Sequence, residues 1–237
     1  MIPKIIHYCW FGRGEMPELA LKCIESWYKF MPGWEYKLWN EDNFDVNSVP
    51  YVKEAYEARK FAFVTDYVRL YALCKEGGVY MDTDVEVLKP YDDLLHLTAF
   101  TGYEGSKKMP PVTGTMASEA NGEWVKEQLA AYEGKHFIKK DGSLDLTTNT
   151  VLITSIMEAN GFVSTGKMQQ YKDITIFPCE YFCPRQTTGE ILLSENTYCD
   201  HHFMGTWSGK KQKNWFLRLV GPKMSIRLIK LKRRLFG

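Results

Sequence analysis

The sequence lacks long apolar runs and internal repetition. No stretch of its 237 residues approaches the ~18 continuous apolar residues that a membrane-spanning helix requires. The opening segment, MIPKIIHYCWFG, is too short in its apolar part and too quickly polar to be a secretory signal. Low-complexity linkers are also missing. We therefore expect a cytoplasmic protein with one folded domain, or one domain with a small appendage.

Cysteine is scarce and irregularly placed. The 6 cysteines follow no regular spacing, and a chain of 237 residues can bury enough apolar surface to fold without disulfides. Cys179 and Cys183 have a spacing that zinc ligands tolerate, but no second close pair accompanies Cys199. The sequence therefore indicates reduced thiols and no zinc site.

Acidic residues are missing from the end of the chain. Asp200 is the last one, so residues 1–200 carry 20 basic against 29 acidic side chains, a balance of −9, while residues 201–237 carry 10 basic side chains and no acid. The net charge of +1 therefore hides an acidic body and a basic tail. An acidic body does not suit nucleic acid as a partner.

The basic tail also carries apolar residues at helical spacing. Its apolar stripe consists of Met224, Leu228, Leu231 and Leu235. Packing of the helix on the domain would explain the apolar stripe but not the charge. The 10 basic side chains without an acid favour attraction to an anionic membrane surface. We therefore expect residues 1–208 to form the main domain, and residues 209–237 to form a basic amphipathic helix that holds the protein peripherally at the inner face of the membrane.

The apolar pattern alternates between strands and helices, most clearly over the first ninety residues. The predicted strands cover residues 3–12, 34–40, 77–86, 97–105 and 173–182. The predicted helices cover residues 17–33, 51–78 (in two pieces), 122–132 and 148–161. This order predicts an α/β fold whose sheet has parallel crossover connections.

Two carboxylates stand close together in the strand predicted over residues 77–86. In an extended strand Asp82 and Asp84 would point to the same face, with Cα atoms ~7 Å apart. An exposed polar face, continued by Glu86, explains this pattern without any function. Alternatively, the two acids share a divalent cation, which removes their repulsion and leaves coordination positions for a phosphate. On that interpretation, neutralising either acid relieves a repulsion and leaves stability unchanged or slightly higher.

An acid and a base precede this strand on one helix face. Asp66 and Arg69 are three positions apart, so they can form a structural ion pair, which contributes little when exposed. Together with the carboxylates, however, they resemble the DxD-containing sugar transferases of glycosyltransferase family 32. That family includes the yeast outer-chain mannosyltransferase and many bacterial capsule enzymes, and the glucosyltransferase domains of large clostridial toxins are similar in the same places.

Three blocks carry the resemblance, in order, over most of the chain. They are IPKIIHYCWFG near the start, TDYVRLYAL with GGVYMDTDVEVLKP in the middle, and HHFMGTWS near the end. The resemblance implies a GT-A fold, with a Rossmann-like nucleotide-sugar-binding sheet and flanking helices. It also implies metal-dependent transfer from a nucleotide sugar with retention of the anomeric configuration.

The resemblance assigns roles to particular residues. It implies that Asp84 binds Mn²⁺ or Mg²⁺ directly, while Asp82 reaches the ribose and a metal-bound water. Trp10 would stack on the nucleobase. Asp66 and Arg69 would contact the donor, with Arg69 supporting the sugar or the diphosphate.

The late block offers a further ligand and a cover for the donor. His201 and His202 would point to opposite sides of an extended segment, so at most one serves a given site. Imidazole can join carboxylates around a divalent ion, and we favour His202 as the third metal ligand over a pair of histidines without such a role. Trp207, between two glycines, is expected on a mobile flap over the donor, with a buried core position as the alternative.

The predicted function is the transfer of a hexose from a nucleotide sugar, preferably a UDP-sugar, to a saccharide or lipid-linked acceptor in capsular polysaccharide biosynthesis. GDP-mannose and the choice between front-face and double-displacement chemistry stay open. A phosphatase of the haloacid dehalogenase type also ends a strand with Asp-x-Asp, but usually carries Thr or Val where this chain has Glu86. A catalytically silent sugar-binding protein is the alternative from a different class.

Overall fold

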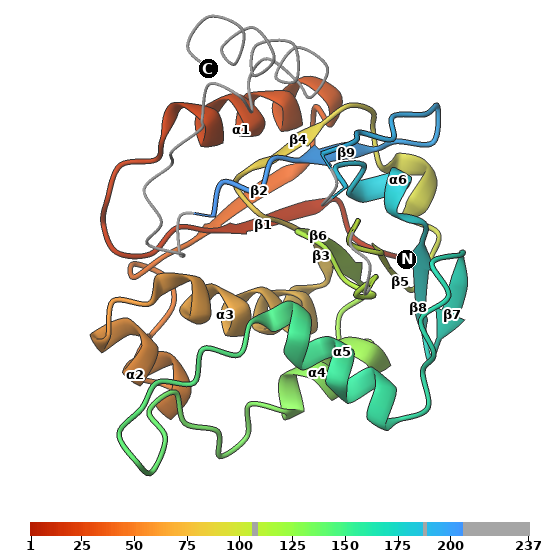
Figure 1. Ribbon diagram of the computed structural model, residues 1–237. Helices are drawn as coiled ribbons and strands as arrows, with labels where there is room; N and C mark the ends of the chain where they lie inside the picture. The colour runs from red at the N-terminus through yellow and green to blue at the C-terminus, as the bar shows by residue number, and fades with distance from the viewer. Residues whose placement is uncertain (106–108, 187–188, 206–237) are drawn as a thin grey trace, which may run out of the picture.

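The computed structural model describes residues 1–105, 109–186 and 189–205 (Figure 1). Trp207 and the segment 209–237 lie outside the described residues. The flap, the basic helix and the domain boundary at residue 208 therefore stay predictions.

A mixed sheet of 7 strands forms the centre of the molecule, in the order β2-β1-β3-β6-β5-β8-β7. The strands are β1 (Ile5–Cys9), β2 (Glu35–Trp39), β3 (Gly78–Met81), β5 (Ala99–Gly102), β6 (Thr115–Ser118), β7 (Gln169–Tyr171) and β8 (Ile174–Phe177). β1 runs parallel to both β2 and β3, and β5 runs parallel to β8, whereas β6 and β7 are antiparallel to their neighbours. The predicted α/β fold with parallel crossovers is confirmed.

Helices cover both faces of this sheet, as the expected GT-A arrangement requires (Figure 1). One face carries α1 (Glu18–Phe30) and α6 (Cys179–Phe182). The other carries α2 (Pro50–Glu57), α3 (Phe61–Glu76), α4 (Glu123–Ala130) and α5 (Asn149–Ala159), and a 3-10 turn, η1, spans Asp92–Leu94. Because neighbouring side chains of a strand point to opposite faces, Val79 and Met81 of β3 join the core with α1, while Tyr80 joins the core with α3.

Two glycines connect α3 directly to β3. Gly77 closes the helix with φ +67°, and its N–H donates to the carbonyl of Leu73 at 2.9 Å. A Cβ on Gly78 would lie 2.6 Å from the carbonyl oxygen of Ile5, because β1 passes close by. This abrupt connection fixes where β3 begins, and therefore where its acidic end lies.

A second sheet pairs β4 (Val85–Val87) with β9 (Cys199–His201) in antiparallel fashion. It lies beside α1, where Trp27 Nε1 donates to the carbonyl of Val85 at 2.7 Å and Ser26 Oγ accepts from Val87 N at 2.8 Å (Figure 1). The prediction of one strand over residues 77–86 is therefore wrong. β3 ends at Met81, and the chain turns so that β4 can bury its two valines under α1.

The strand predicted over residues 173–182 is also shorter than expected. β8 ends at Phe177, and Pro178 then starts the single turn of α6. Proline lacks the N–H that a central strand needs, and its fixed φ suits a helix start. Among the described residues, no helix is both long and apolar enough to cross a membrane.

Candidate active site

The turn between β3 and β4 brings the two acidic side chains together. Val85 N donates to the carbonyl of Asp82 at 3.0 Å, which closes a turn around Asp82 and Asp84. The carboxylates thus converge because the backbone turns and not because side chains alternate along an extended strand. The turn lies at the carboxyl end of β3, the edge where α/β sheets commonly bind ligands.

Each carboxylate has one oxygen held by the protein and one that faces a histidine. Oδ1 of Asp82 accepts from the Tyr80 hydroxyl at 2.8 Å and lies 3.2 Å from Arg69. Oδ2 of Asp84 accepts from the backbone N–H of Met204 at 2.6 Å. The remaining oxygens, Oδ2 of Asp82 and Oδ1 of Asp84, lie 4.0 and 3.2 Å from Nε2 of His201. Anchoring one oxygen of each pair fixes the direction of the other.

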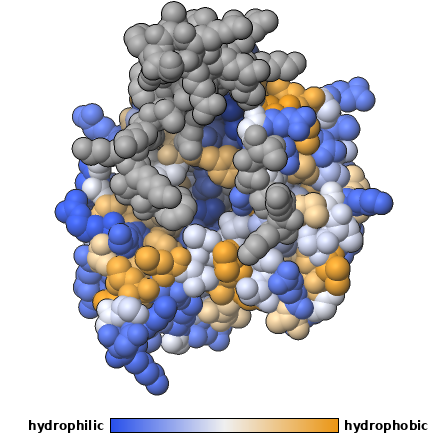
Figure 2. Space-filling view, in the orientation of Figure 1, coloured by the Kyte–Doolittle hydropathy of each residue, from blue (hydrophilic) through white to orange (hydrophobic). Residues whose placement is uncertain are grey.

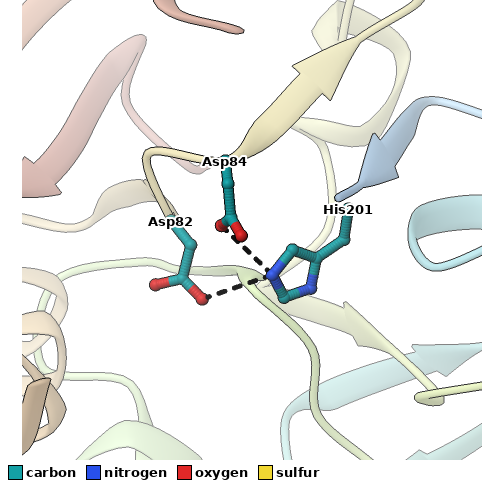
Figure 3. Close-up of side chains that lie close together, drawn as sticks. All are labelled: Asp82, Asp84 and His201. Atoms are coloured by element: carbon teal, nitrogen blue, oxygen red, sulfur yellow. Dashed lines mark ion pairs between the residues drawn. The ribbon is translucent and has the colours of Figure 1, made fainter. Parts of the chain in front are cut away.

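Asp82, Asp84 and His201 form a group that could hold a metal ion (Figure 3). One ligand atom from each residue lies within 4.8 Å of the other two. Carboxylate oxygens suit Mg²⁺ and Mn²⁺, and imidazole suits several divalent transition metals, so the donor set fits a divalent cation. The side chains of Asp84 and His201 are about nine-tenths buried. Few water molecules can therefore reach these two side chains and compete with them for an ion.

The charges of this group are strongly coupled. Burial alone would raise the pKa of Asp84, but the charge and hydrogen bond of His201, helped by the Met204 N–H, lower it to about 2. Burial likewise opposes a charge on His201, yet Asp84 raises the pKa of that imidazole well above its usual value. The buried carboxylate of Asp84 is therefore stabilised by a positive charge beside it, which a proton on His201 or a cation can supply.

His202, the ligand preferred from the sequence, does not lie in this group. Its Nε2 lies 2.8 Å from Oε2 of Glu86, while its backbone N–H donates to the carbonyl of Asp84 at 3.0 Å. His201 and His202 do point to opposite sides, as predicted, and the structure turns His201 toward the carboxylates. The strand register decides this, because Val85 of β4 pairs with His201 of β9.

The pair predicted on α3 joins the same site. Arg69 lies 3.1 Å from Oδ1 of Asp66 and 3.2 Å from Oδ1 of Asp82, and its guanidinium stacks 4.6 Å from the centre of the Tyr80 ring. Burial raises the pKa of Asp66 to about 6, although Arg69 opposes this shift. The pair is therefore a buried connection to the DxD turn and not an exposed surface pair.

Trp10 lies just beyond β1, the strand next to β3. Its side chain is half-buried, and its Nε1 donates to the carbonyl of Gly14 at 2.6 Å. A cavity of about 360 Å³ opens near this strand end, lined by Gly12, Tyr56, Glu57, Arg59 and Phe61. Trp10 thus lies at the same edge of the sheet as the acidic turn.

Four further residues contribute to the site without having been predicted. Tyr80 and Met204 hold the carboxylates, as described above. The backbone carbonyl of Gly114 accepts a hydrogen bond from the N–H of Asp82 at 2.8 Å. Glu104, two residues beyond β5, lies near enough to His201 for the two charges to interact: burial raises the pKa of its carboxyl group, and the charge of His201 opposes this shift. Tyr80 could have been noticed in the sequence, because it alternates with Asp82. Met204, Gly114 and Glu104 reach the site only through contacts between distant parts of the chain, which no local sequence pattern predicts.

The visible face of the molecule is hollowed near its middle, where hydrophilic residues lie deeper than their surroundings (Figure 2). Where the structure describes the residues beside this hollow, both hydrophilic and apolar residues occur.

A family model described as a glycosyltransferase sugar-binding region containing a DXD motif matches residues 17–101. The match includes the acidic turn, and Asp66 and Arg69 of α3. The resemblance inferred from the sequence is confirmed by this match.

Curated relatives match over parts of their length. An inositol phosphoceramide mannosyltransferase of Schizosaccharomyces pombe is 34% identical over 103 residues, which are 42% of this chain and 29% of the relative. An uncharacterised glycosyltransferase of Acanthamoeba polyphaga mimivirus is 34% identical over 111 residues, 44% of each protein. A Legionella pneumophila protein named subversion of eukaryotic traffic protein A is 23% identical over 59% of this chain and 26% of its own length. The chain thus spans less than half of these relatives.

Solved structures with a similar chain path include two glycosyltransferases. The PaToxG glycosyltransferase has a TM-score of 0.45 and 16% identity, over 68% of this chain and 69% of its own. A glycosyltransferase involved in the glycosylation of the major capsid of PBCV-1 has a TM-score of 0.43 and 10% identity, over 75% and 83% of the two chains.

Proposed function

Because residues 17–101 carry the sugar-binding region of DXD glycosyltransferases, we propose that this chain transfers a hexose from a nucleotide sugar with the help of a divalent cation. The observation that carries the proposal is the convergence of Asp82, Asp84 and His201, each with a ligand atom directed at a common point. No phosphatase is proposed, since the family match concerns sugar transfer.

The residues of the site would bind the cation, orient Asp82 and place a positive charge beside the donor. Asp82, Asp84 and His201 would hold the cation, which when bound would stabilise the negative charge of the departing nucleoside diphosphate. Arg69, fixed between Asp66 and Asp82, would keep Asp82 oriented and place a permanent positive charge beside the donor.

The donor would lie along the carboxyl edge of the sheet. Trp10 and the cavity beside it would receive the nucleobase, and Asp66 with Arg69 would contact the sugar or the diphosphate. Trp207 would close over the donor and limit hydrolysis by water. These roles rest on the resemblance and on the common edge that Trp10 shares with the acidic turn.

Donor and acceptor are proposed by class. UDP-sugars are preferred, and GDP-mannose is included because two of the relatives are named mannosyltransferases. Those names also mention inositol phosphoceramide, a lipid with an inositol phosphate headgroup, which supports a lipid-linked acceptor without pointing to capsular polysaccharide. We further propose retention of the anomeric configuration and peripheral attachment to an anionic membrane surface through the basic tail.

Donor hydrolysis without acceptor tests the proposal. The purified chain should release nucleoside diphosphate from at least one of UDP-glucose, UDP-galactose, UDP-N-acetylglucosamine and GDP-mannose, in the presence of Mn²⁺ and not after chelation. Release of phosphate from a monoester would indicate a phosphatase instead. Binding of a donor without turnover under any metal condition would indicate a silent sugar-binding protein. Proton NMR of the first transfer product would report whether the configuration is retained.

A further inference from the structure

Gly114 lies between two of the residues that converge on the proposed cation. It precedes β6, the strand that pairs with β3, and its carbonyl accepts the N–H of Asp82 at 2.8 Å. A Cβ built on Gly114 would lie 2.8 Å from Oδ2 of Asp82 and 2.9 Å from Cε1 of His201. Oδ2 is the oxygen of Asp82 that faces the histidine. A methyl group at this position would thus press on two of the three ligand residues at once.

The backbone does not explain why position 114 is glycine. Its φ is not among the left-handed values found at other glycines of the chain, so an L-residue fits the local conformation. The missing side chain, rather than backbone freedom, is the feature that this position requires.

Neither side of the contact can withdraw easily. The backbone is held by the Asp82 N–H on one side and by the Thr113 hydroxyl, which accepts from Thr115 N at 3.1 Å, on the other. Asp82 is anchored through its other oxygen by Tyr80 and Arg69. The His201 ring stacks on Phe203, with ring centres 4.1 Å apart. A methyl group would therefore displace the Asp82 oxygen and the imidazole from their common point.

We propose that Gly114 is a positioning residue that keeps the cation site open, because only a residue without a side chain lets Asp82 and His201 approach each other. The proposal rests on the metal dependence proposed above. It adds a determinant from a third part of the chain, outside both the DxD turn and the late histidine block.

Mn²⁺ binding to the full chain tests this role without any assay of transfer. Electron paramagnetic resonance would measure free Mn²⁺ during titration of the wild type, Gly114→Ala and Gly14→Ala, each alone and with UDP. Gly14 is the matched control, since a Cβ there meets nothing within 4 Å and its backbone is not left-handed. We expect Gly114→Ala to weaken Mn²⁺ binding by roughly tenfold or more, as changes next to metal ligands do, and Gly14→Ala to bind like the wild type.

A double-mutant cycle separates the steric effect from a general loss of folding. If the methyl group strikes the imidazole, Gly114→Ala should lower the melting temperature in the wild type and have a smaller effect in a His201→Ala background. Equal Mn²⁺ affinity of Gly114→Ala and wild type would overturn the proposal. So would equal destabilisation in both backgrounds. Failure of the wild type itself to bind Mn²⁺, with or without UDP, would instead reject the proposed cation site as a whole, and Gly114's role with it.

Discussion

At the scale of single residues, the two acids of the DxD turn differ in how the protein holds them. Asp84 is buried, accepts from a backbone N–H and faces His201, whereas Asp82 is one-quarter exposed and is held by side chains. The structure therefore changes the expectation that neutralising either acid would only relieve a repulsion. In the folded state the negative charge of Asp84 is favoured, as its lowered pKa of about 2 shows.

We predict that Asp84→Asn abolishes donor hydrolysis and lowers the free energy of unfolding by about 3 kcal/mol, the usual cost of removing one partner of a buried ion pair. Chemical denaturation without metal measures the second effect. Glu86→Gln is a suitable control, because Glu86 pairs with His202 away from the cation group and is more exposed. Full activity of Asp84→Asn with Mn²⁺ present would contradict the cation-site hypothesis.

Tyr80 offers a milder test of the same carboxylate cluster. Its ring is fully buried, and its hydroxyl donates to Asp82 at 2.8 Å. We predict that Tyr80→Phe keeps the ring stacked on Arg69, costs about 1 kcal/mol of stability, and lowers donor turnover roughly tenfold because Asp82 loses an anchor.

Tyr36→Phe is the matched control for the hydroxyl. The Tyr36 hydroxyl donates to the carbonyls of Trp27 and Met31, away from the acidic turn. The Tyr36→Phe variant should lose about as much stability as Tyr80→Phe, while its donor turnover stays at the wild-type value. Equal turnover in both variants would mean that the Tyr80 hydroxyl does not position Asp82.

Site residues were predictable to the extent that they lie in a local motif. Asp82, Asp84, Asp66 and Arg69 are all found together, because they lie within one helix, the strand that follows it and the turn directly after that strand. The choice between His201 and His202 depended on strand register across more than one hundred positions, which no local pattern encodes. Gly114 was missed for a related reason, since a glycine before a short strand looks like any turn until the pairing of β6 with β3 is known.

At the scale of the elements, His7 ties three parts of the fold together. It is fully buried on β1; its Nε2 lies 2.7 Å from the carbonyl of Gly77, and its Nδ1 accepts from Trp39 Nε1 at 3.0 Å. It thus connects β1 with the end of α3 and with β2. Burial lowers the pKa of His7, because a charged imidazole would lose its hydration.

This burial predicts a loss of stability in mild acid. The unfolded chain takes up a proton at His7 near pH 6.5, while the folded chain keeps the imidazole neutral at that pH. The unfolded state therefore binds more protons, and stability falls as the pH drops below about 6.5, until the folded-state pKa is reached. The difference in urea midpoint between the wild type and His7→Gln, measured at pH 7.5, 6.5 and 5.5, isolates this effect, because His201 and Asp66, whose pKa values are raised, contribute with the opposite sign in both proteins. Protonation of His7 near pH 6.5 in the folded protein, observed by NMR, would contradict it.

The sequence predicted the longer elements better than the short ones. The first strands and helices are confirmed because apolar spacing and glycine or proline boundaries agree there. β6 (Thr115–Ser118) was missed, since TMAS is short and buried on both faces and so shows no alternation. β3 and β4 were merged because one alternating pattern runs through both, and only their pairing with different strands, β6 for β3 and β9 for β4, separates them.

At the scale of the whole molecule, the uneven charge calls for a test of membrane attachment. The body up to residue 200 carries −9, and the following residues carry +10. We predict that the full chain sediments with vesicles containing anionic phosphatidylglycerol, less so as salt rises, and not with neutral phosphatidylcholine vesicles.

Truncation after Ser208 should abolish this sedimentation while donor hydrolysis continues. The basic segment would then serve localisation, separately from chemistry. If the truncated and full-length chains sedimented equally with anionic vesicles, the membrane hypothesis would fail. Loss of folding on truncation would instead assign the segment to the domain.

Because the small sheet joins β4 to β9, which are far apart in the chain, the proposed cation site can form only late in synthesis. Both acids of the proposed cation site precede β4 and its histidine ends β9, while the N–H of Met204 reaches Asp84 across 120 positions. A growing chain that already contains both acids therefore has no complete set of ligands until nearly all of the described fold has left the ribosome. Unfinished or prematurely terminated chains would carry the DxD motif and yet be unable to consume nucleotide sugars without transferring them.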